Sequence, residues 1–308
     1  MKRQWKYFGF FLIIPILLSI SLYNHHGKEL KRSDKIEISI VSLNKKYSSS
    51  DIDSLLYINR FHHSDLIVFP EAIFMCHENT YNYTPTLTSI KRHLTDSLSS
   101  SSVVMGLWLY NNNKELYNVA LVYSNTINLL RYKQYRMPFA EFLPNASLLG
   151  KIKFIRNMVV YPVDIRENKQ NVITIKNITF SPLICYESIC PAFICRLVRE
   201  GSNFFTISAS NSSLNSCHIE KTANNILKAL AIATRRSIIR AVDNGESCFI
   251  SSNGTISNIE VNTTCLETQS VVKDQNYSVY VLMERELTCV YFILLFLVVT
   301  ISGFVRFK

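Results

Sequence analysis

Two uncharged apolar stretches, one near each end, place the strongest limit on what this chain of 308 residues can fold into. They are residues 7–23 and 287–305, and basic residues lie at the outer end of each. A membrane-spanning helix needs roughly 17–25 such residues. We therefore expect one anchor in 1–24, a second in 287–308, and a separate domain over 25–286. Because basic flanks stay in the cytoplasm, this domain is expected on the other side of the membrane.

The first apolar stretch has a second interpretation, which is a cleaved signal peptide. Its apolar run is longer than the usual core of such a peptide, and no clear small-residue cleavage site follows it. These two features favour an uncleaved anchor. For the last stretch the alternative is a buried helix of a soluble core, which an unbroken uncharged run of this length disfavours.

The formal net charge of +10 indicates an anionic partner. Nucleic acid is not expected, because the basic residues are scattered and no nucleic-acid-binding motif accompanies them. An anionic membrane surface suits the charge better, since the terminal segments already indicate a membrane. Hydrophobic residues make up 48% of the chain, which is enough for a packed core between the two ends.

The eight cysteines would ordinarily suggest disulfides in an exported domain, but their spacing is not that of a small disulfide scaffold. On a predicted helix, Cys190 and Cys195 lie too far apart for an easy bridge. Cys248 and Cys265 flank a predicted hairpin and could pair. No cysteine and histidine pattern has zinc spacing, so we expect no metal site.

Between the apolar ends, short strands alternate with helices, a pattern typical of one α/β domain. Strands are predicted at residues 35–43, 65–71, 102–110, 117–124, 127–135, 171–176, 179–185, 203–210 and 237–242. Helices are predicted at residues 51–63, 86–99, 191–200 and 217–235. A last β region is predicted over 247–283, with a turn at Asn253-Gly254.

Three short motifs lie at strand ends or in the loops beside them. They are FPE at 69–71, KQYRMPFAE at 133–141 and CYE at 185–187, and they supply a carboxylate, an amine and a thiol. Each has an ordinary alternative when taken alone: an exposed carboxylate, a solvated basic strand, or a small buried cysteine.

Together the three motifs fit nucleophilic catalysis by a thiol. A thiol attacks as a thiolate, so Glu71 is the candidate for the group that takes its proton. Lys133 is placed to stabilise the negative charge that develops on an attacked carbonyl. Cys185 stands where a buried strand gives way to a helix, so its sulfur is expected near unpaired N–H groups.

The chain resembles the nitrilase superfamily in the order of these residues and, more narrowly, the apolipoprotein N-acyltransferase family. The narrow resemblance rests on KQYRMPFAEFLP, ICYES, FFTIS and RRSIIRAVDNG, and it covers about residues 36–283. It implies an α/β fold, a four-layer α-β-β-α sandwich, and a reaction without a metal or a diffusible cofactor.

The resemblance also implies roles for the matching residues. Glu71 would be general base and acid, and Cys185 would carry the acyl group as a thioester. Lys133 would stabilise the oxyanion together with the backbone N–H of Tyr186. Two further carboxylates, Glu141 and Glu187, would orient the lysine and the thiol.

The implied function is a membrane-anchored N-acyltransferase. A phospholipid would donate the acyl chain, and the N-terminal cysteine of a lipoprotein, or another amine, would accept it. The implied location is the bacterial inner membrane, with the catalytic domain on the periplasmic side. One alternative is a nitrilase-type amidase, in which water resolves the acyl-enzyme; another is a non-catalytic binding module, which would not need the three reactive groups.

Four features depart from the narrower family. Only one apolar segment precedes the domain where that family carries several, so a partner subunit could supply the missing helices. Residues 209–216 lack the family's tryptophan, and Ala140 replaces a glycine. His218 is the nearest candidate for the family's histidine and has an ordinary alternative as a surface residue.

Overall fold

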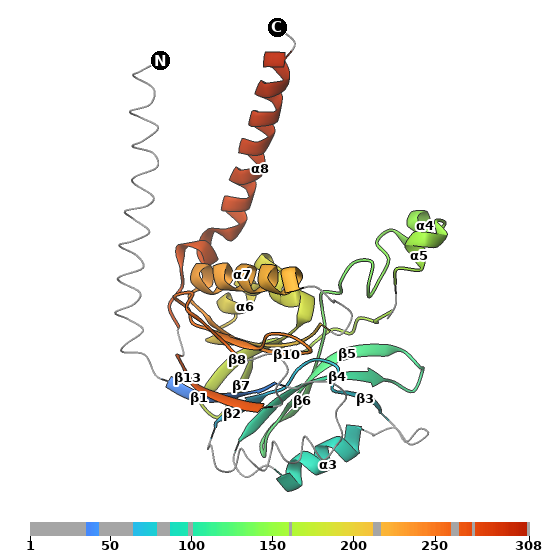
Figure 1. Cartoon of the computed structure of the whole chain (residues 1–308), viewed down its shortest axis with the longest axis vertical. Helices are drawn as coiled ribbons and strands as arrows, with labels where there is room; N and C mark the ends of the chain where they lie inside the picture. Colours follow the sequence, from blue (N-terminus) through green and yellow to red (C-terminus); the bar gives the residue numbers. More distant parts are fainter. Residues whose placement is uncertain are drawn as a thin grey trace.

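The computed structural model describes most of the domain between the two predicted anchors. It also describes a C-terminal helix that includes most of the second predicted anchor. The described residues are 35–42, 64–78, 87–97, 101–159, 162–211, 217–259, 265–272 and 275–306. They form two β-sheets that lie face to face, with helices on both outer sides (Figure 1).

The first sheet is mixed. Its strands, in spatial order, are β13 (Cys265–Val272), β1 (Lys35–Ser42), β2 (Leu66–Val68), β4 (Ser102–Tyr110), β5 (Leu116–Tyr123) and β6 (Asn128–Tyr132), and β3 (Phe74–His77) pairs with β4. The pairs β1–β2 and β2–β4 are parallel, whereas β4–β5 and β5–β6 form antiparallel hairpins. Both faces of the central strands are covered, so β4 and β5 are buried almost throughout.

The second sheet has a parallel centre. Its order is β12 (Ile256–Asn258), β11 (Cys248–Ile250), β10 (Ser237–Asp243), β9 (Phe204–Ser210), β8 (Ile178–Ile184) and β7 (Ile173–Ile175). The β8–β9 and β9–β10 pairs are parallel, so their carboxyl ends meet at one edge of the sheet. In α/β proteins, loops at that edge commonly carry the reactive groups.

The layers are held together by three apolar clusters. Between the sheets, Ile38 and Val104 pack with Phe204 and Ile239. The other two clusters lie under the helices: α3 (Leu87–Ser97) covers the first sheet, and α6 (Pro191–Arg199) with α7 (Cys217–Thr234) covers the second. The arrangement confirms the predicted α-β-β-α layering (Figure 1).

Most predicted elements are present with small shifts at their ends. The strand predicted at 102–110 is β4, and the helix predicted from Pro191 is α6, in which the proline takes the first helical turn, where no N–H is needed. The helix predicted at 51–63 lies outside the described residues. The β prediction for 247–283 is wrong at its end, because α8 (Val279–Arg306) begins at Val279.

The proposed pairing of Cys248 with Cys265 is also wrong. Cys248 is a buried free thiol in β11 of the second sheet, whereas Cys265 begins β13 of the first. The hairpin that the sequence suggested does not form between them, because β11 pairs with β12 and β13 crosses to pair with β1. Cys190 and Cys195 are free thiols as well, as their helical spacing predicted.

Neither predicted membrane anchor is confirmed. The N-terminal one, residues 1–24, lies outside the described residues, and most of 287–308 falls within α8. Within the part of the chain that the structure describes, none of the helices is both long and apolar enough to span a bilayer.

Candidate active site

Cys185 lies at a sharp turn between β8 and a short 3₁₀ helix, η1 (Cys185–Ile189). Its φ of 47° is in the left-handed region, which non-glycine residues seldom adopt. Ser188 donates a hydrogen bond to the Cys185 carbonyl at 2.6 Å and so closes the turn. The side chain is half-buried, at the point where the buried strand ends.

Tyr186 follows the cysteine as the second residue of η1 and is half-buried. The first N–H groups of a helix have no acceptor within that helix. The backbone N–H of Tyr186 is one of these groups, so it is available to an anion formed beside Cys185.

Glu71 comes from the first sheet, three residues after β2 ends, and is buried. Its carboxylate accepts hydrogen bonds from Asn118 Nδ2 at 2.5 Å and from the Ser210 backbone N–H at 3.0 Å. The loop packs tightly on β4, since a Cβ on Gly106 would lie 2.5 Å from Glu71 Cα. Glycine at 106 therefore lets the Glu71 backbone approach the sheet.

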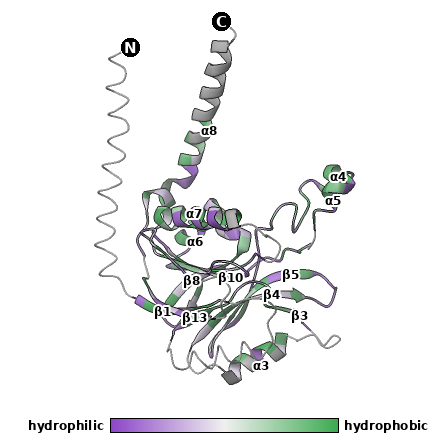
Figure 2. Cartoon of the chain, in the orientation of Figure 1, coloured by the Kyte–Doolittle hydropathy of each residue, from purple (hydrophilic) through white to green (hydrophobic). Residues whose placement is uncertain are grey.

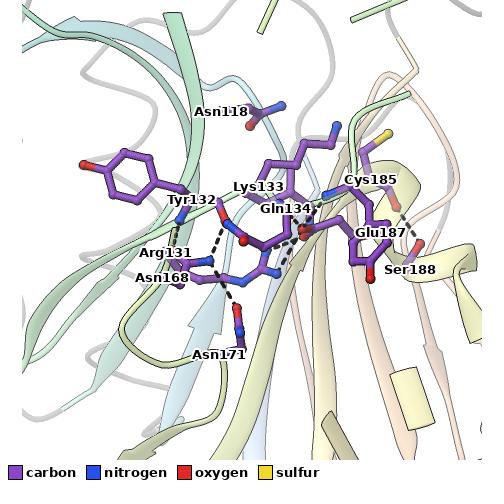
Figure 3. Close-up of polar contacts among 12 residues, drawn as sticks. Asn118, Arg131, Tyr132, Lys133, Gln134, Asn168, Asn171, Cys185, Glu187 and Ser188 are labelled. Atoms are coloured by element: carbon purple, nitrogen blue, oxygen red, sulfur yellow. Dashed lines mark hydrogen bonds and ion pairs between the residues drawn. The ribbon is translucent and has the colours of Figure 1, made fainter. Parts of the chain in front are cut away.

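Lys133 directly follows β6, and its side chain is fully buried. Its Nζ lies 2.6 Å from Glu141 Oε1 and 3.7 Å from Glu71 Oε1. The backbone N–H of Lys133 also donates to the carbonyl of Asn118 at 2.8 Å. Figure 3 shows the lysine amine and the Cys185 sulfur directed to the same side of the site.

Glu141 holds the lysine from the loop that follows it. One carboxylate oxygen accepts from Lys133 Nζ, and the other accepts from the Met137 backbone N–H at 2.7 Å. The same carboxylate therefore fixes both the amine and the turn that carries it. Phe139, within this turn, has a φ of 65°.

Glu187 is fully buried, and its carboxylate contacts one basic side chain and several main-chain N–H groups. It forms a buried ion pair with Arg131 of β6. It also accepts from the backbone N–H groups of Gln134 at 2.5 Å and Ile184 at 2.9 Å. One carboxylate thus ties the loop of the lysine to the strand end of the cysteine (Figure 3).

The pKa shifts follow from burial and from the neighbouring charges. Burial raises the pKa of Glu71, although Lys133 and the Asn118 hydrogen bond act in the opposite direction. Burial and the charge of Glu71 raise the pKa of Cys185 to about 12, against a lowering effect of Lys133. Burial alone would lower the pKa of Lys133, but Glu71, Cys185 and Glu141 raise it above its usual value. The amine therefore stays charged at neutral pH, and the thiol keeps its proton until a base takes it.

The structure brings the three predicted reactive groups together, and it adds two polar residues that the sequence analysis missed. Asn118 and Arg131 are both buried, and they contact Glu71 and Glu187 respectively. The sequence did contain a sign of their importance, because each is a polar residue inside an otherwise apolar strand. Burying such a residue costs free energy unless it has a hydrogen-bond or ion-pair partner. In the described part of the chain, the histidine, cysteine and acidic side chains form no group of three suited to a metal ion. The side chain of His218 is outside the described residues.

The chain matches the sequence profile of a family described as carbon-nitrogen hydrolase over residues 43–266, which is most of its length. The chain belongs to the carbon-nitrogen hydrolase family.

Relatives within this family carry a more specific name. Apolipoprotein N-acyltransferase of Pasteurella multocida is 24% identical over 68% of this chain and 41% of the relative. The protein of the same name from Rickettsia typhi is 24% identical over 66% of this chain and 41% of the relative. The chain thus spans about two fifths of the length of these curated relatives.

Several solved structures share the fold. An amidase of the nitrilase superfamily from Nesterenkonia AN1 superposes with a TM-score of 0.59 at 13% identity, covering 83% of this chain and 97% of the amidase. A variant of an amidase from Nesterenkonia sp. AN1 carries an acetamide moiety covalently added at its active-site cysteine; its TM-score is 0.57 at 13% identity, over 78% of this chain and 91% of the amidase. A glutamine-dependent NAD+ synthetase from Acinetobacter baumannii gives 0.55 at 14% identity, over 77% of this chain and 45% of the synthetase.

Proposed function

We propose that this chain is an N-acyltransferase that carries its acyl group on Cys185 and uses Glu71 and Lys133 as its other two catalytic residues. The observation that carries the proposal is the position of the Lys133 amine, which lies 3.7 Å from Glu71 and is directed to the same side of the site as the Cys185 sulfur (Figure 3). A base, a fixed positive charge and a thiol at one site are the groups that acyl transfer through a thioester needs.

In the first half-reaction, Glu71 takes the thiol proton as the Cys185 sulfur attacks the carbonyl carbon of an ester donor. The oxygen of the tetrahedral intermediate becomes negative, and the Lys133 ammonium and the Tyr186 backbone N–H stabilise it. The carbon–oxygen bond of the ester then breaks, and Glu71 returns the proton to the departing alcohol. The product on the protein is a thioester at Cys185.

In the second half-reaction, an amine attacks the thioester carbon. Glu71 accepts a proton from the attacking nitrogen, the carbon–sulfur bond breaks, and the Cys185 sulfur regains a proton. The products are an amide and the free enzyme. The raised pKa of Glu71 suits both directions of proton transfer, because a base of intermediate strength can accept and return a proton near neutral pH.

The names of the curated relatives support a lipid chemistry for this reaction. We propose a phospholipid as acyl donor and the N-terminal cysteine of a lipoprotein, or another amine, as acceptor. Because both substrates reside in a bilayer, we further propose that the chain works at the periplasmic face of a bacterial inner membrane, held there by its two apolar ends. A membrane partner subunit belongs to the same proposal.

A second candidate is a nitrilase-type amidase, and the amidase fold neighbour from Nesterenkonia AN1 favours it. Its first step would be the same attack on an amide carbon, with ammonia or an amine as the leaving group. Water in place of an amine would then resolve the acyl-enzyme. The two functions differ in the donor that loads the thiol and in the acceptor that unloads it.

Intact-mass measurement after incubation with phospholipid tests the proposal. We expect the wild-type chain to gain one acyl group, and Cys185→Ala to gain none. Cys190→Ala is the matched control, because Cys190 is also a half-buried free thiol five residues away, and it should acylate as wild type does. Acylation of Cys185→Ala would contradict the proposal, and loading by small amides but never by phospholipid would favour the amidase.

A further inference from the structure

Residues 142–159 form an arm that leaves the body of the molecule directly after the active-site loop. It contains two one-turn helices, α4 (Ala146–Leu149) and α5 (Lys153–Arg156), and neither has a buried residue. Figure 1 shows the arm projecting beyond the sheets, toward the side from which α8 extends. The rest of the described chain therefore leaves most side chains of these two helices exposed.

The arm is apolar where a solvated loop would be polar. Its large exposed side chains are Leu148, Ile152, Phe154 and Met158, and that of Phe154 is 77% exposed. Single exposed apolar side chains are ordinary, but several within one short projecting segment mark a contact surface. Figure 2 shows hydrophobic residues beside hydrophilic ones along this arm.

All the charged residues of the arm are basic. Lys151, Lys153 and Arg156 are exposed within the apolar group, and no acidic residue occurs between Glu141 and Asp164. Lysine and arginine beside aliphatic and aromatic side chains are the composition of segments that lie in the headgroup region of a bilayer. Protein interfaces, in contrast, are depleted of lysine.

The base of the arm is part of the site. The carbonyl of Glu141 accepts a hydrogen bond from the Val163 backbone N–H at 3.1 Å, and the carboxylate of Glu141 holds the Lys133 amine at 2.6 Å. Arg136 also donates to the Val163 carbonyl at 2.8 Å. A surface that binds the arm is therefore held next to the lysine.

We propose that the 142–159 arm inserts its apolar side chains into the headgroup and acyl boundary of a bilayer containing anionic phospholipid. The basic residues of the arm bind the headgroups, and Leu148, Ile152 and Phe154 enter the apolar layer. The contact needs no segment that spans the membrane. It places the base of the arm, beside Glu141, against the lipid surface.

Quenching of tryptophan fluorescence by brominated acyl chains tests the proposal in the full-length protein. Phe154→Trp is compared with Thr88→Trp, an exposed position on α3 at the other side of the molecule, in vesicles of phosphatidylethanolamine and phosphatidylglycerol. The native Trp5 and Trp108 contribute equally to both variants. Above this common background, we expect additional quenching and a blue shift for Phe154→Trp but not for Thr88→Trp. Equal quenching at the two positions overturns the proposal.

The contribution of the basic residues to membrane binding is tested by a separate measurement. Lys151→Glu, Lys153→Glu and Arg156→Glu are combined in the Phe154→Trp protein, and quenching is measured with and without phosphatidylglycerol. We expect the charge reversal to reduce quenching in the anionic vesicles. Unchanged quenching there overturns the role of the three basic residues. Each measurement is repeated with Cys185→Ala, so that the position of the arm is read independently of the proposed chemistry.

A kinetic comparison links the arm to substrate access. For Phe154→Asp we expect acyl loading from vesicle phospholipid to fall at least tenfold, while loading from a water-soluble short-chain ester stays as in wild type. Equal losses with both donors contradict a membrane contact, because the arm would then act on the chemistry itself.

Discussion

At the scale of single residues, Cys185 and Glu71 influence each other's ionisation. Each carries a raised pKa, burial is the largest cause for both, and the charge of Glu71 is the next cause for the thiol. A thiolate and a carboxylate this close would repel each other, so the resting site holds only one of the two negative charges. Lys133 compensates that charge from 3.7 Å.

The same pair sets the pH dependence of acyl loading. Glu71 must be unprotonated to take the thiol proton, so the rate is lost as pH falls through its raised pKa, which lies above the ordinary value of 4.5. The raised pKa of Lys133 keeps the amine charged throughout the neutral range. A rate profile with its acid limb at or below pH 4.5 would contradict this assignment.

Asn118→Ala should move this acid limb to higher pH. The amide hydrogen bond lowers the pKa of Glu71, so its removal leaves burial less opposed and raises that pKa further. Acyl-loading rates measured across pH 4 to 9 show the shift, with Asn203→Ala as control for loss of a buried asparagine elsewhere. A loss of rate that is the same at every pH would contradict a role through Glu71.

At the scale of secondary structure, the site depends on where strands end. Lys133 follows β6, Cys185 follows β8, and Ser210, which donates its backbone N–H to Glu71, ends β9. The buried pair of Arg131 and Glu187 couples two of these ends, because Glu187 also accepts from main-chain N–H groups on both sides. Buried ion pairs are held in place by such additional hydrogen bonds.

Arg131→Met should destabilise the fold strongly. It leaves the Glu187 carboxylate buried without its cation, a change that typically costs about 3–5 kcal/mol. Arg196→Met is the matched control, since both guanidinium groups lie over the Phe193 ring, but Arg196 pairs with Glu200 at the surface. For Arg196→Met we expect the free energy of unfolding to fall by less than about 1 kcal/mol. Urea unfolding measures both, and equal losses would contradict the special role of the buried pair.

At the scale of the whole molecule, the site forms at the junction of the two sheets. Glu71 and Lys133 come from the first sheet, and Cys185 and Ser210 from the second. Hydrogen bonds cross the junction, from Ser208 Oγ to the Phe69 carbonyl at 2.8 Å and from the Glu71 N–H to the Ala209 carbonyl at 3.2 Å. The reactive groups therefore meet only when the sheets pack.

Reductant should leave the stability of the folded domain unchanged. The six cysteines whose side chains the structure describes are free thiols, so none of them forms a disulfide that contributes to the free energy of unfolding. Urea midpoints with and without dithiothreitol should therefore coincide. A lower midpoint under reduction would contradict this expectation.

The sequence by itself determined the α/β class, most strand and helix positions, and the three motifs that carry the reactive groups. It could do so because periodicity and turn residues act locally, and because a thiol, a carboxylate and an amine at strand ends are visible as letters. The resemblance of the motifs also placed the chain in its family.

Only the tertiary structure decided which distant groups touch. The partners of Asn118 and Arg131 and the separation of Cys248 from Cys265 follow from how the two sheets pack and how their strands pair. No local pattern contains that information, because burial and the resulting pKa shifts arise from residues far apart in the chain. Whether Glu71 can take the Cys185 proton likewise depends on the packing that brings Glu71 to the site and buries it.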